Sequence, residues 1–265
     1  MCIKILDLIE NELYIDFRYL DVAISTLILT PKESLRSTAT DGISLFFPPE
    51  QILRVFRSNP LFLNRAVLHS VFHCIFRHLW IRGNRDSDLW NLSCDIAVEW
   101  IIDSFDKKSV KRALSGIRTN IYNDFEKQNI PVTAANIYHY LLSDVTENPD
   151  RLNQLTMEFF TDDHRFWPKD PSRSPSAAKA GQSWDKISRR MEQELNLRGD
   201  HTASGAEAIK AQIKEGKSRR SYKDFLRKFT VLQEELHCDY DEFDLNYYSY
   251  GLRLYKNMPL IEPLE

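Results

Sequence analysis

The sequence has few of the residues that interrupt helices. Of its 265 residues, 8 are glycine and 11 are proline. Because tight hairpin turns depend on these residues, their scarcity is typical of a helical protein rather than of one with many short strands. Hydrophobic residues make up 43% of the chain and charged residues 28%. This balance excludes a disordered or collagen-like protein and allows one or two domains.

Three further absences exclude other classes of protein. No stretch approaches the roughly 18 apolar residues of a membrane-spanning helix, and the charged start of the chain does not resemble a signal peptide. We therefore expect a cytoplasmic protein with no membrane partner. The net charge of −3 provides no basic surface for DNA or RNA, so we expect no nucleic-acid partner. The four cysteines form no C-x-x-C pair, which indicates reduced thiols rather than a disulfide framework or a zinc ribbon.

The spacing of apolar residues predicts a mainly α fold, α+β in detail, with one small edge hairpin or sheet. The hairpin is expected over residues 37–49, where Asp41-Gly42 separates a Thr-rich arm from an alternating apolar arm. Asn59-Pro60 is expected to separate a helix that starts at Pro49 from the next one. The longer helices are predicted at 3–29, 61–81, 89–105 and 134–142.

A change of composition near Trp167 predicts the division of the chain into parts. Residues 168–183 are rich in Pro, Ser and Lys, which is typical of a linker or an exposed loop. We therefore expect one domain over 1–167 and a helical segment over 184–265. Within that segment we expect one helix that ends at Gly199 and another that Ser221 caps.

Two pairs of polar residues lie within otherwise apolar helices. His69 and His73 are four residues apart, so they share one helix face at a separation that a single metal ion can bridge. Asp95 and Glu99 repeat this spacing. If the two helices pack together, two imidazoles and one carboxylate form a typical catalytic zinc set. The predicted ligands are therefore His69, His73 and Asp95, with zinc as the cofactor.

His78 is an alternative third ligand. It lies five residues after His73, about 140° around a straight helix, and reaches the same face only if the helix breaks near Arg77. Cys74 and Cys94 are each adjacent to a predicted ligand and therefore face elsewhere, so we expect both to be small core residues.

An interpretation of these polar pairs without a metal is also possible. The two histidines can be hydrogen-bonded to Asp95 and Glu99, which satisfies four buried polar groups in a purely structural or interaction domain. A second polar and aromatic group, Asp163-His164 with Trp167, is expected to form an exposed turn.

Several strings resemble a known family. LHSVFHCIFRHLW at 68–80 and LWNLSCDIAVEWIID at 89–103 resemble the metallopeptidase-like domain at the start of bacterial proteins that continue into a von Willebrand A-like domain. TATDG at 38–42 resembles the edge strand of that domain, and DDHRFW at 162–167 resembles another of its elements. RRSYKDFLRKF at 219–229 and NMPLIEPLE at 257–265 resemble its junction with the second domain.

The resemblance implies a zincin-like helical core, with a central HxxxH helix packed on a DxxxE helix. It implies that residues 184–265 lead towards a C-terminal von Willebrand A-like domain, so the chain would be the front portion of a longer protein. It also implies a MoxR-like AAA+ ATPase as partner and a protein or peptide as client.

One position departs from the family pattern. The glutamate that follows the first histidine, the general base of such peptidases, is Ser70 here. A serine hydroxyl cannot take a proton from zinc-bound water at neutral pH, and loss of a general base removes roughly 10² to 10⁴ in rate. We therefore expect a metal-binding domain with weak or no proteolytic activity that acts as an adaptor or substrate-handling module with the ATPase. The alternative is an active zinc hydrolase in which Glu99 is the base and His164 or His78 assists the oxyanion.

Overall fold

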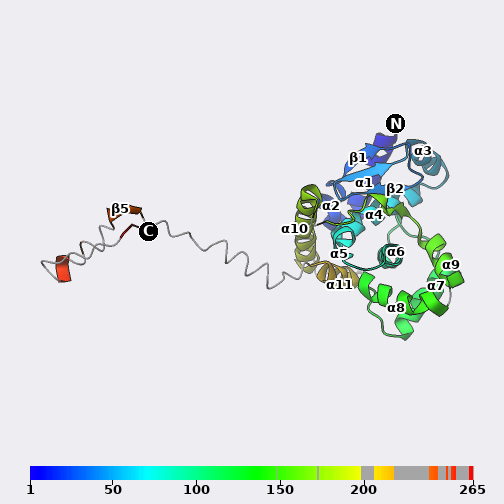
Figure 1. Cartoon of the computed structure of the whole chain (residues 1–265). Helices are drawn as coiled ribbons and strands as arrows, with labels where there is room; N and C mark the ends of the chain where they lie inside the picture. The colour runs from blue at the N-terminus through cyan, green and yellow to red at the C-terminus, as the bar shows by residue number, and fades with distance from the viewer. Residues whose placement is uncertain are drawn as a thin grey trace. The chain divides into compact units, whose positions relative to one another are not determined.

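Helices predominate in the structure, a computed structural model, as the scarcity of glycine and proline predicts. It describes residues 1–147, 149–171, 173–197, 206–217, 239–243, 249, 252–254 and 263–264. The chain divides into two units, residues 1–218 and 219–265 (Figure 1). In the second unit, β5 (Asp239–Phe243) pairs antiparallel with β6 (Pro263–Leu264).

The first unit contains the helices, a small sheet and the candidate site. Its α-helices are α1 (Cys2–Asp16), α2 (Asp21–Ile24), α3 (Pro49–Ser58), α4 (Pro60–Ile75), α5 (His78–Ile81), α6 (Ser87–Ser104), α7 (Gly116–Lys127), α8 (Ala134–Glu147), α9 (Pro149–Phe159), α10 (Pro175–Leu197) and α11 (Ala206–Gly216). Its short 3-10 helices are η1 (Arg18–Leu20) and η2 (His164–Phe166), and its strands are β1 (Ile28–Pro31), β2 (Thr38–Thr40), β3 (Ser44–Phe47) and β4 (Asp162–Asp163).

The sheet confirms the predicted hairpin and extends it. Its order is β1-β3-β2-β4, with β2 and β3 antiparallel. At the turn, the Asp41 carboxylate accepts hydrogen bonds from the amides of Ile43 and Ser44, and Gly42 has φ of +85°. On the other edge of β2, β4 pairs in parallel, so that Thr38 lies opposite Asp162. This pairing brings a segment from far along the chain beside the hairpin.

Helix α4 lies at the centre of the first unit. From Leu63 to Ile75 all its residues are buried, because the sequence is apolar on every face of the helix. Helices α1, α3, α6 and α10 pack against it, and α8 and α9 cover α6 on the side away from α4 (Figure 1). The predicted starts of the helices at Pro49 and after Asn59 are confirmed.

The expected helix over residues 3–29 is interrupted. Helix α1 ends at Asp16, and Phe17 leaves the helical region with φ of −127°. The Phe17 ring is buried against Phe105, with 4.9 Å between ring centroids. Residues 28–31 form β1, which pairs with β3. Tertiary packing and sheet pairing override the helical pattern here, and no Gly or Pro marks the break.

The segment expected to be a linker is partly helical. Helix α10 begins at Pro175, and proline is well tolerated in the first turn of a helix. Trp184, Met191 and Leu195 of this helix belong to the same core as α4. The boundary between the units therefore follows Ser218 instead of falling at 168–183. The expected end of one helix at Gly199 and the expected N-cap of the next at Ser221 lie outside the described residues.

Gly42 occupies a position where a side chain would clash. A Cβ atom there would lie 2.6 Å from the Trp80 ring, and its φ of +85° is unfavourable for other residues. We expect Gly42→Ala to reduce the free energy of unfolding by roughly 2–4 kcal/mol, because the strain of the left-handed backbone adds to overpacking. Gly83→Ala is the matched control, since Gly83 also has positive φ but no atom near its Cβ position. Denaturant unfolding of both variants measures the difference, and equal losses would contradict the proposed clash.

Glu10 on α1 predicts a pH dependence of stability. Burial, with a contribution from Asp7, raises the pKa of Glu10 from 4.5 to about 7. Below pH 4.5 the group is protonated in both states. As the pH rises towards 7 the unfolded state loses this proton first, so the free energy of unfolding falls. Because the side chain is only half-buried, we expect a loss of about 1 kcal/mol.

Glu10→Gln should remove this loss between pH 5 and pH 8, as measured by urea unfolding at each pH. Glu126→Gln changes an exposed glutamate and provides the control. If the free energy of unfolding of Glu10→Gln falls over this pH range as much as that of wild type, another group causes the pH dependence.

Candidate metal centre

Helix α4 supplies the first two side chains of the site. His69 and His73 lie one turn apart, and both are completely buried. Their Nε2 atoms are 2.8 Å apart, and their ring centroids are separated by 4.5 Å. The Nε2 atoms of both imidazoles therefore face the same point, as the i,i+4 spacing predicts.

Helix α6 supplies a carboxylate. The helix begins after Asp86, whose side chain accepts hydrogen bonds from two amides of its first turn. Two turns later, Asp95 Oδ1 lies 3.4 Å from His69 Nε2 and 3.2 Å from His73 Nε2. The predicted convergence of His69, His73 and Asp95 is therefore present in the structure.

A third segment, β4 with η2, supplies two more side chains. Pairing of β4 with β2 places Asp162 Oδ1 3.4 Å from His69 Nε2. His164 Nε2 lies 3.1 Å from Asp95 Oδ1 and 3.0 Å from Asp162 Oδ1. The Trp167 ring packs on His164, with 4.1 Å between centroids, and limits access from this side.

Together these five residues form a compact set of metal donors. One ligand atom from each of His69, His73, Asp95, Asp162 and His164 lies within 4.8 Å of all the others. Donors placed tetrahedrally at about 2.0–2.1 Å from one zinc ion are roughly 3.3 Å apart. The separations given above, from 2.8 to 3.4 Å, are close to this value, and His73 Nε2 and Asp162 Oδ1 are 3.9 Å apart. The side chains are between 0% and 9% exposed. The residues thus fit a buried divalent cation.

Two atoms of the set lack the hydrogen bonds that burial demands. Asp162 Oδ1 and His164 Nε2 form an ion pair at 3.0 Å, and His164 Nε2 lies 3.1 Å from Asp95 Oδ1, but within the described part of the chain neither Asp162 Oδ1 nor His164 Nε2 makes a hydrogen bond of good geometry. Buried polar atoms rarely remain unpaired, because the loss of hydration is costly. A cation shared by these atoms would coordinate both, whereas without a metal they are held by the ion pairs of His164 with Asp162 and Asp95.

The charges of the site also suit a cation. Burial, reinforced by His69, lowers the pKa of His73 to about 4, so this imidazole is neutral and has the form that ligates metals. Burial opposes ionisation of Asp95, but His164 and the other two imidazoles outweigh it and hold the pKa of Asp95 below its usual range. Burial likewise disfavours charged His164, yet Asp95 and Asp162 raise its pKa to about 10. Burial also opposes protonation of His69, but Asp162, Asp95 and Glu99 hold its pKa well above the usual range. A cation must therefore displace a proton from His164 and from His69 in order to bind them.

Glu99 lies behind His69 and not among the five donors. Its Oε1 accepts a hydrogen bond from His69 Nδ1 at 2.9 Å, which leaves His69 Nε2 free to face the metal. Its Oε2 is paired with Arg65 at 2.5 Å and Arg118 at 2.7 Å. Burial alone would raise the pKa of Glu99, but His69 and the two arginines hold it well below the usual range. This geometry makes Glu99 a positioning residue and does not favour it as a general base.

Ser70 also positions a ligand. Its hydroxyl donates a hydrogen bond to Asp162 Oδ2 at 3.1 Å, which leaves Oδ1 of the same carboxylate for the cluster. The side chain is completely buried. Ser70 thus holds the carboxylate that arrives from β4.

His78 contacts a ligand but is not one of the five donors. Arg77 has φ of +63°, so the helix breaks there and His78 can approach the face of α4 that carries His73. His78 Nδ1 lies 3.0 Å from His73 Nδ1. When His73 Nε2 faces a metal, its Nδ1 carries the hydrogen and donates it to His78, which fixes the orientation of the ring.

The two buried cysteines are core residues, as predicted. Cys74 and Cys94 are both fully buried. Burial raises the pKa of both thiols, so that neither is a thiolate at neutral pH.

Sequence reasoning missed part of the site. Asp162 is not among the predicted ligands, and His164 is predicted in an exposed turn with Trp167 or, in the alternative of an active hydrolase, as a residue that assists the oxyanion. In the structure all three lie at the cluster. The prediction of an exposed turn was wrong because β4 pairs with a strand that lies more than 100 residues earlier in the chain. Local composition does not indicate such pairing. The D-x-H pattern at 162–164 was the one available signal.

The chain matches no known protein family, no curated protein and no solved structure. Within the described part of the chain, no helix is both long enough and apolar enough to cross a membrane. The function is therefore inferred from the residues of the site.

The contact between Glu99 and His69 gives a prediction about metal affinity. Substitution of a residue that orients a metal-bound histidine typically reduces affinity 10–100-fold. We expect Glu99→Gln to weaken metal binding by about this factor, measured by competition with a chelator of known affinity. Glu158→Gln alters another partner of Arg118 that does not touch a ligand. It should leave metal affinity within about twofold of wild type, and an equal loss in both variants would show a general effect of the ion-pair network.

Proposed function

We propose that the first unit is a metal-binding domain that holds one divalent cation, zinc, in a closed site with little or no hydrolytic activity. The observation that carries this proposal is the convergence of three imidazoles and two carboxylates, with one ligand atom of each within 4.8 Å of all the others. The cation would serve to join α4, α6 and the β4–η2 segment.

The closed nature of the site argues against hydrolysis. Catalytic zinc sites use three protein ligands and keep a position open for water, whereas structural sites are filled by the protein. Five donors are available here, and Trp167 packs over two of the imidazoles. The serine at position 70 is bonded to Asp162, and Glu99 is paired with two arginines. Among the described residues, no carboxylate remains near the cluster to act as a general base.

Zinc is favoured by the three imidazoles, which suit zinc and other late transition metals better than magnesium or calcium. When bound, the cation supplies Lewis acidity and charge neutralisation of Asp95 and Asp162. Neighbouring residues orient the ligands: Glu99 and His78 each orient one imidazole, and Ser70 orients one carboxylate.

The family resemblance supports a wider proposal. Ser70 at the position of the general base, together with a filled ligand set, suits a metallopeptidase-like domain that has become an adaptor or substrate-handling module. We propose a MoxR-like AAA+ ATPase as its partner and a protein or peptide as its client. Co-purification of the chain with such an ATPase from the native host tests this part separately from the metal.

The central experiment is elemental analysis of protein purified without a His tag, combined with a peptide-library assay. We expect stoichiometric zinc and cleavage no greater than that of the Asp95→Ala variant. Absence of any divalent metal would support the hydrogen-bonded reading instead. Zinc-dependent cleavage that Asp95→Ala abolishes would overturn the closed, non-hydrolytic site.

A further inference from the structure

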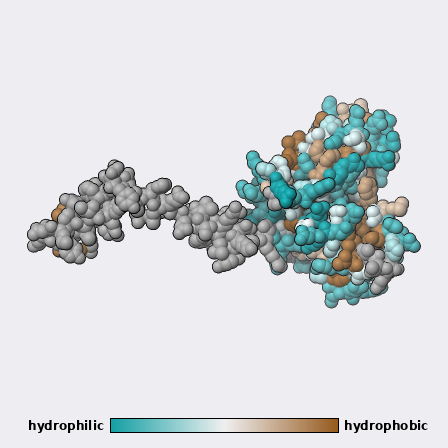
Figure 2. Space-filling model, in the orientation of Figure 1, coloured by the Kyte–Doolittle hydropathy of each residue, from teal (hydrophilic) through white to brown (hydrophobic). Residues whose placement is uncertain are grey.

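Helix α1 has apolar side chains on its outer face as well as on its buried face. The buried face, formed by Ile5, Leu6, Ile9 and Leu13, packs within the first unit, where α1 contacts α3 and α4. Four further apolar residues of the helix are at least half exposed, namely Ile3, Leu8, Tyr14 and Ile15. In Figure 2, hydrophobic areas lie beside hydrophilic ones at the end of the first unit where Figure 1 marks the N-terminus. Single exposed apolar residues are common, but a group of four on one helix is typical of an interaction surface.

The exposed residues form two rows along α1. Leu8 and Ile15 are seven residues apart, which places them in one row, two turns apart. The second row is Ile3, Asp7, Glu10 and Tyr14, whose spacings of four, three and four residues make each a surface neighbour of the next. Two carboxylates therefore lie between two apolar side chains on the outer side of the helix.

Helix α1 is negatively charged. It contains four carboxylates and one lysine, which gives a net charge of −3. Two of the carboxylates, Glu12 and Asp16, accept hydrogen bonds from side chains of other segments of the first unit. The other two, Asp7 and Glu10, are the pair in the second row, so the negative charge without an internal partner lies beside the exposed apolar residues.

Asp7 and Glu10 lack a cation. Burial and the neighbouring Asp7 raise the pKa of Glu10 to about 7, and no cation counters these two effects. Asp7 is exposed, and within the part of the chain that the structure describes neither carboxylate forms an ion pair. A Lys or Arg side chain placed against both carboxylates would favour their charged forms.

The charge distinguishes between the partners that an apolar helix face can have. A second copy of α1 would bring like charges together, and an anionic membrane surface would repel the same carboxylates. A helix that has an apolar stripe flanked by Lys or Arg matches both the exposed apolar rows and the two carboxylates. The outer face of α1 therefore suits such a helix best.

We propose that the outer face of α1 binds a basic amphipathic helix of a partner protein. The apolar stripe of that helix covers Leu8 and Ile15, and its Lys or Arg side chains pair with Asp7 and Glu10. This face points away from the core that contains α4, and the proposal does not depend on a metal at the candidate centre.

The test uses the full chain and three synthetic peptides with blocked ends, each about 18 residues long so that it can form a helix. The first has a stripe of Leu flanked by Lys, the second has Glu in place of Lys, and the third has the composition of the first in scrambled order. By calorimetry we expect saturable binding of the Lys peptide and at least about tenfold weaker binding of the other two. In NMR titrations the largest shifts should be those of α1 amides.

Matched variants locate the binding. Leu8→Ser and the double variant Asp7→Asn/Glu10→Gln should each reduce the affinity for the Lys peptide about tenfold. Leu142→Ser is the control for Leu8→Ser, because Leu142 is 50% exposed on α8. Glu33→Gln/Glu126→Gln removes two exposed charges outside α1 and is the control for the double variant. Neither control should change the affinity.

Several outcomes would overturn the proposal. They are no saturable binding of the Lys peptide, equal binding of the Glu or the scrambled peptide, and unchanged affinity in both α1 variants. Sedimentation of the chain and flotation with phosphatidylserine vesicles test the other occupants. Self-association or vesicle binding that Leu8→Ser abolishes would show that a second copy or a membrane covers this face instead.

Discussion

His69→Ala is expected to abolish stoichiometric metal binding and to lower the stability of the protein. His69 Nε2 lies within 3.4 Å of donor atoms of His73, Asp95 and Asp162, so its loss removes a ligand that is close to three of the other four. A cation that binds only the folded state adds about 4 kcal/mol of stability when present at 1,000 times its dissociation constant. The variant should lose a contribution of this size.

The measurements are metal content and thermal unfolding, each with and without EDTA. For wild type, we expect EDTA to lower the midpoint of unfolding by roughly 8–16 °C, since the cation contributes about 4 kcal/mol and about 1 kcal/mol corresponds to roughly 2–4 °C for a unit of this size. For His69→Ala, EDTA should have no effect. His139→Ala is the control because His139 is exposed and lies outside the donor set. A wild-type midpoint insensitive to EDTA in protein that contains metal would contradict a stabilising role for the cation.

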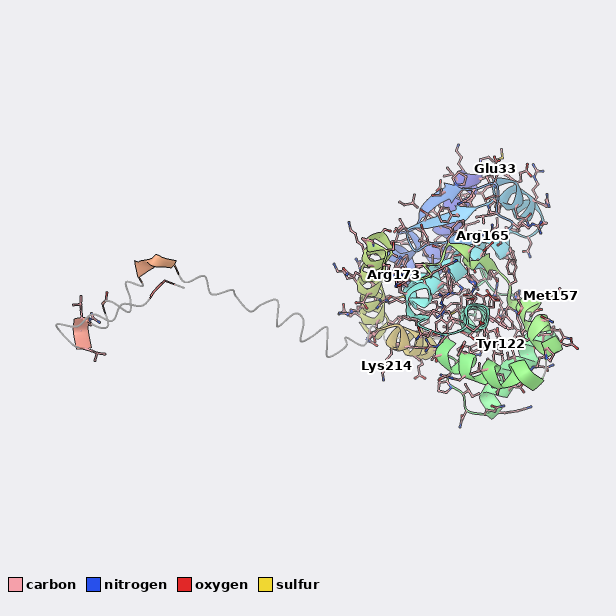
Figure 3. All side chains as sticks on the ribbon, in the orientation of Figure 1. Glu33, Tyr122, Met157, Arg165, Arg173 and Lys214 are labelled. Carbon is pink, nitrogen blue, oxygen red and sulfur yellow. The ribbon has the colours of Figure 1, made fainter. Side chains whose placement is uncertain are left out.

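Arg118→Met is expected to destabilise the protein by about 3–5 kcal/mol, the usual cost of removing one partner from a buried ion pair. Arg118 is 1% exposed. Its guanidinium pairs with Glu99 and Asp103 at 2.7 Å and with Glu158 at 2.8 Å. Asp103 also accepts a hydrogen bond from Tyr122, which lies on α7 (Figure 3). Loss of Arg118 leaves two buried carboxylates with Arg65 as their shared cation.

Chemical denaturation of Arg118→Met measures this cost, with Arg190→Met as the control. Arg190 pairs with Glu194, but its side chain is 60% exposed, so we expect a change below about 1 kcal/mol. A similar small change in Arg118→Met would mean that the buried carboxylates find other partners or take up protons in the variant.

The parts of the site that share a helix could be predicted from the sequence. The spacing of His69 with His73 fixes their common face, and a short connection between α4 and α6 brings Asp95 to them. The break at Arg77 could not be predicted, because nothing in the local sequence requires a left-handed residue there. The sequence shows only that His78 needs such a break to reach the same face as His73.

The contribution of Asp162 and His164 could not be predicted in the same way. It depends on a two-residue strand that is stable only because β2 provides a partner. Tertiary contacts likewise explain why α1 ends at Asp16 and why part of the segment 168–183 is helical. Phe17 and Trp184 take their positions from the core that they enter, and local composition does not record that core.

The bond between Ser70 and Asp162 has a consequence for the order of assembly. It joins residues 92 positions apart, and the donor set spans a similar length of chain. During synthesis, a chain that ends before Asp162 can offer only His69, His73 and Asp95. Closing so long a loop costs entropy that a bound cation can offset. Under the proposed function, tight retention of a cation would therefore require the finished first unit, and metal uptake would report when its folding is complete.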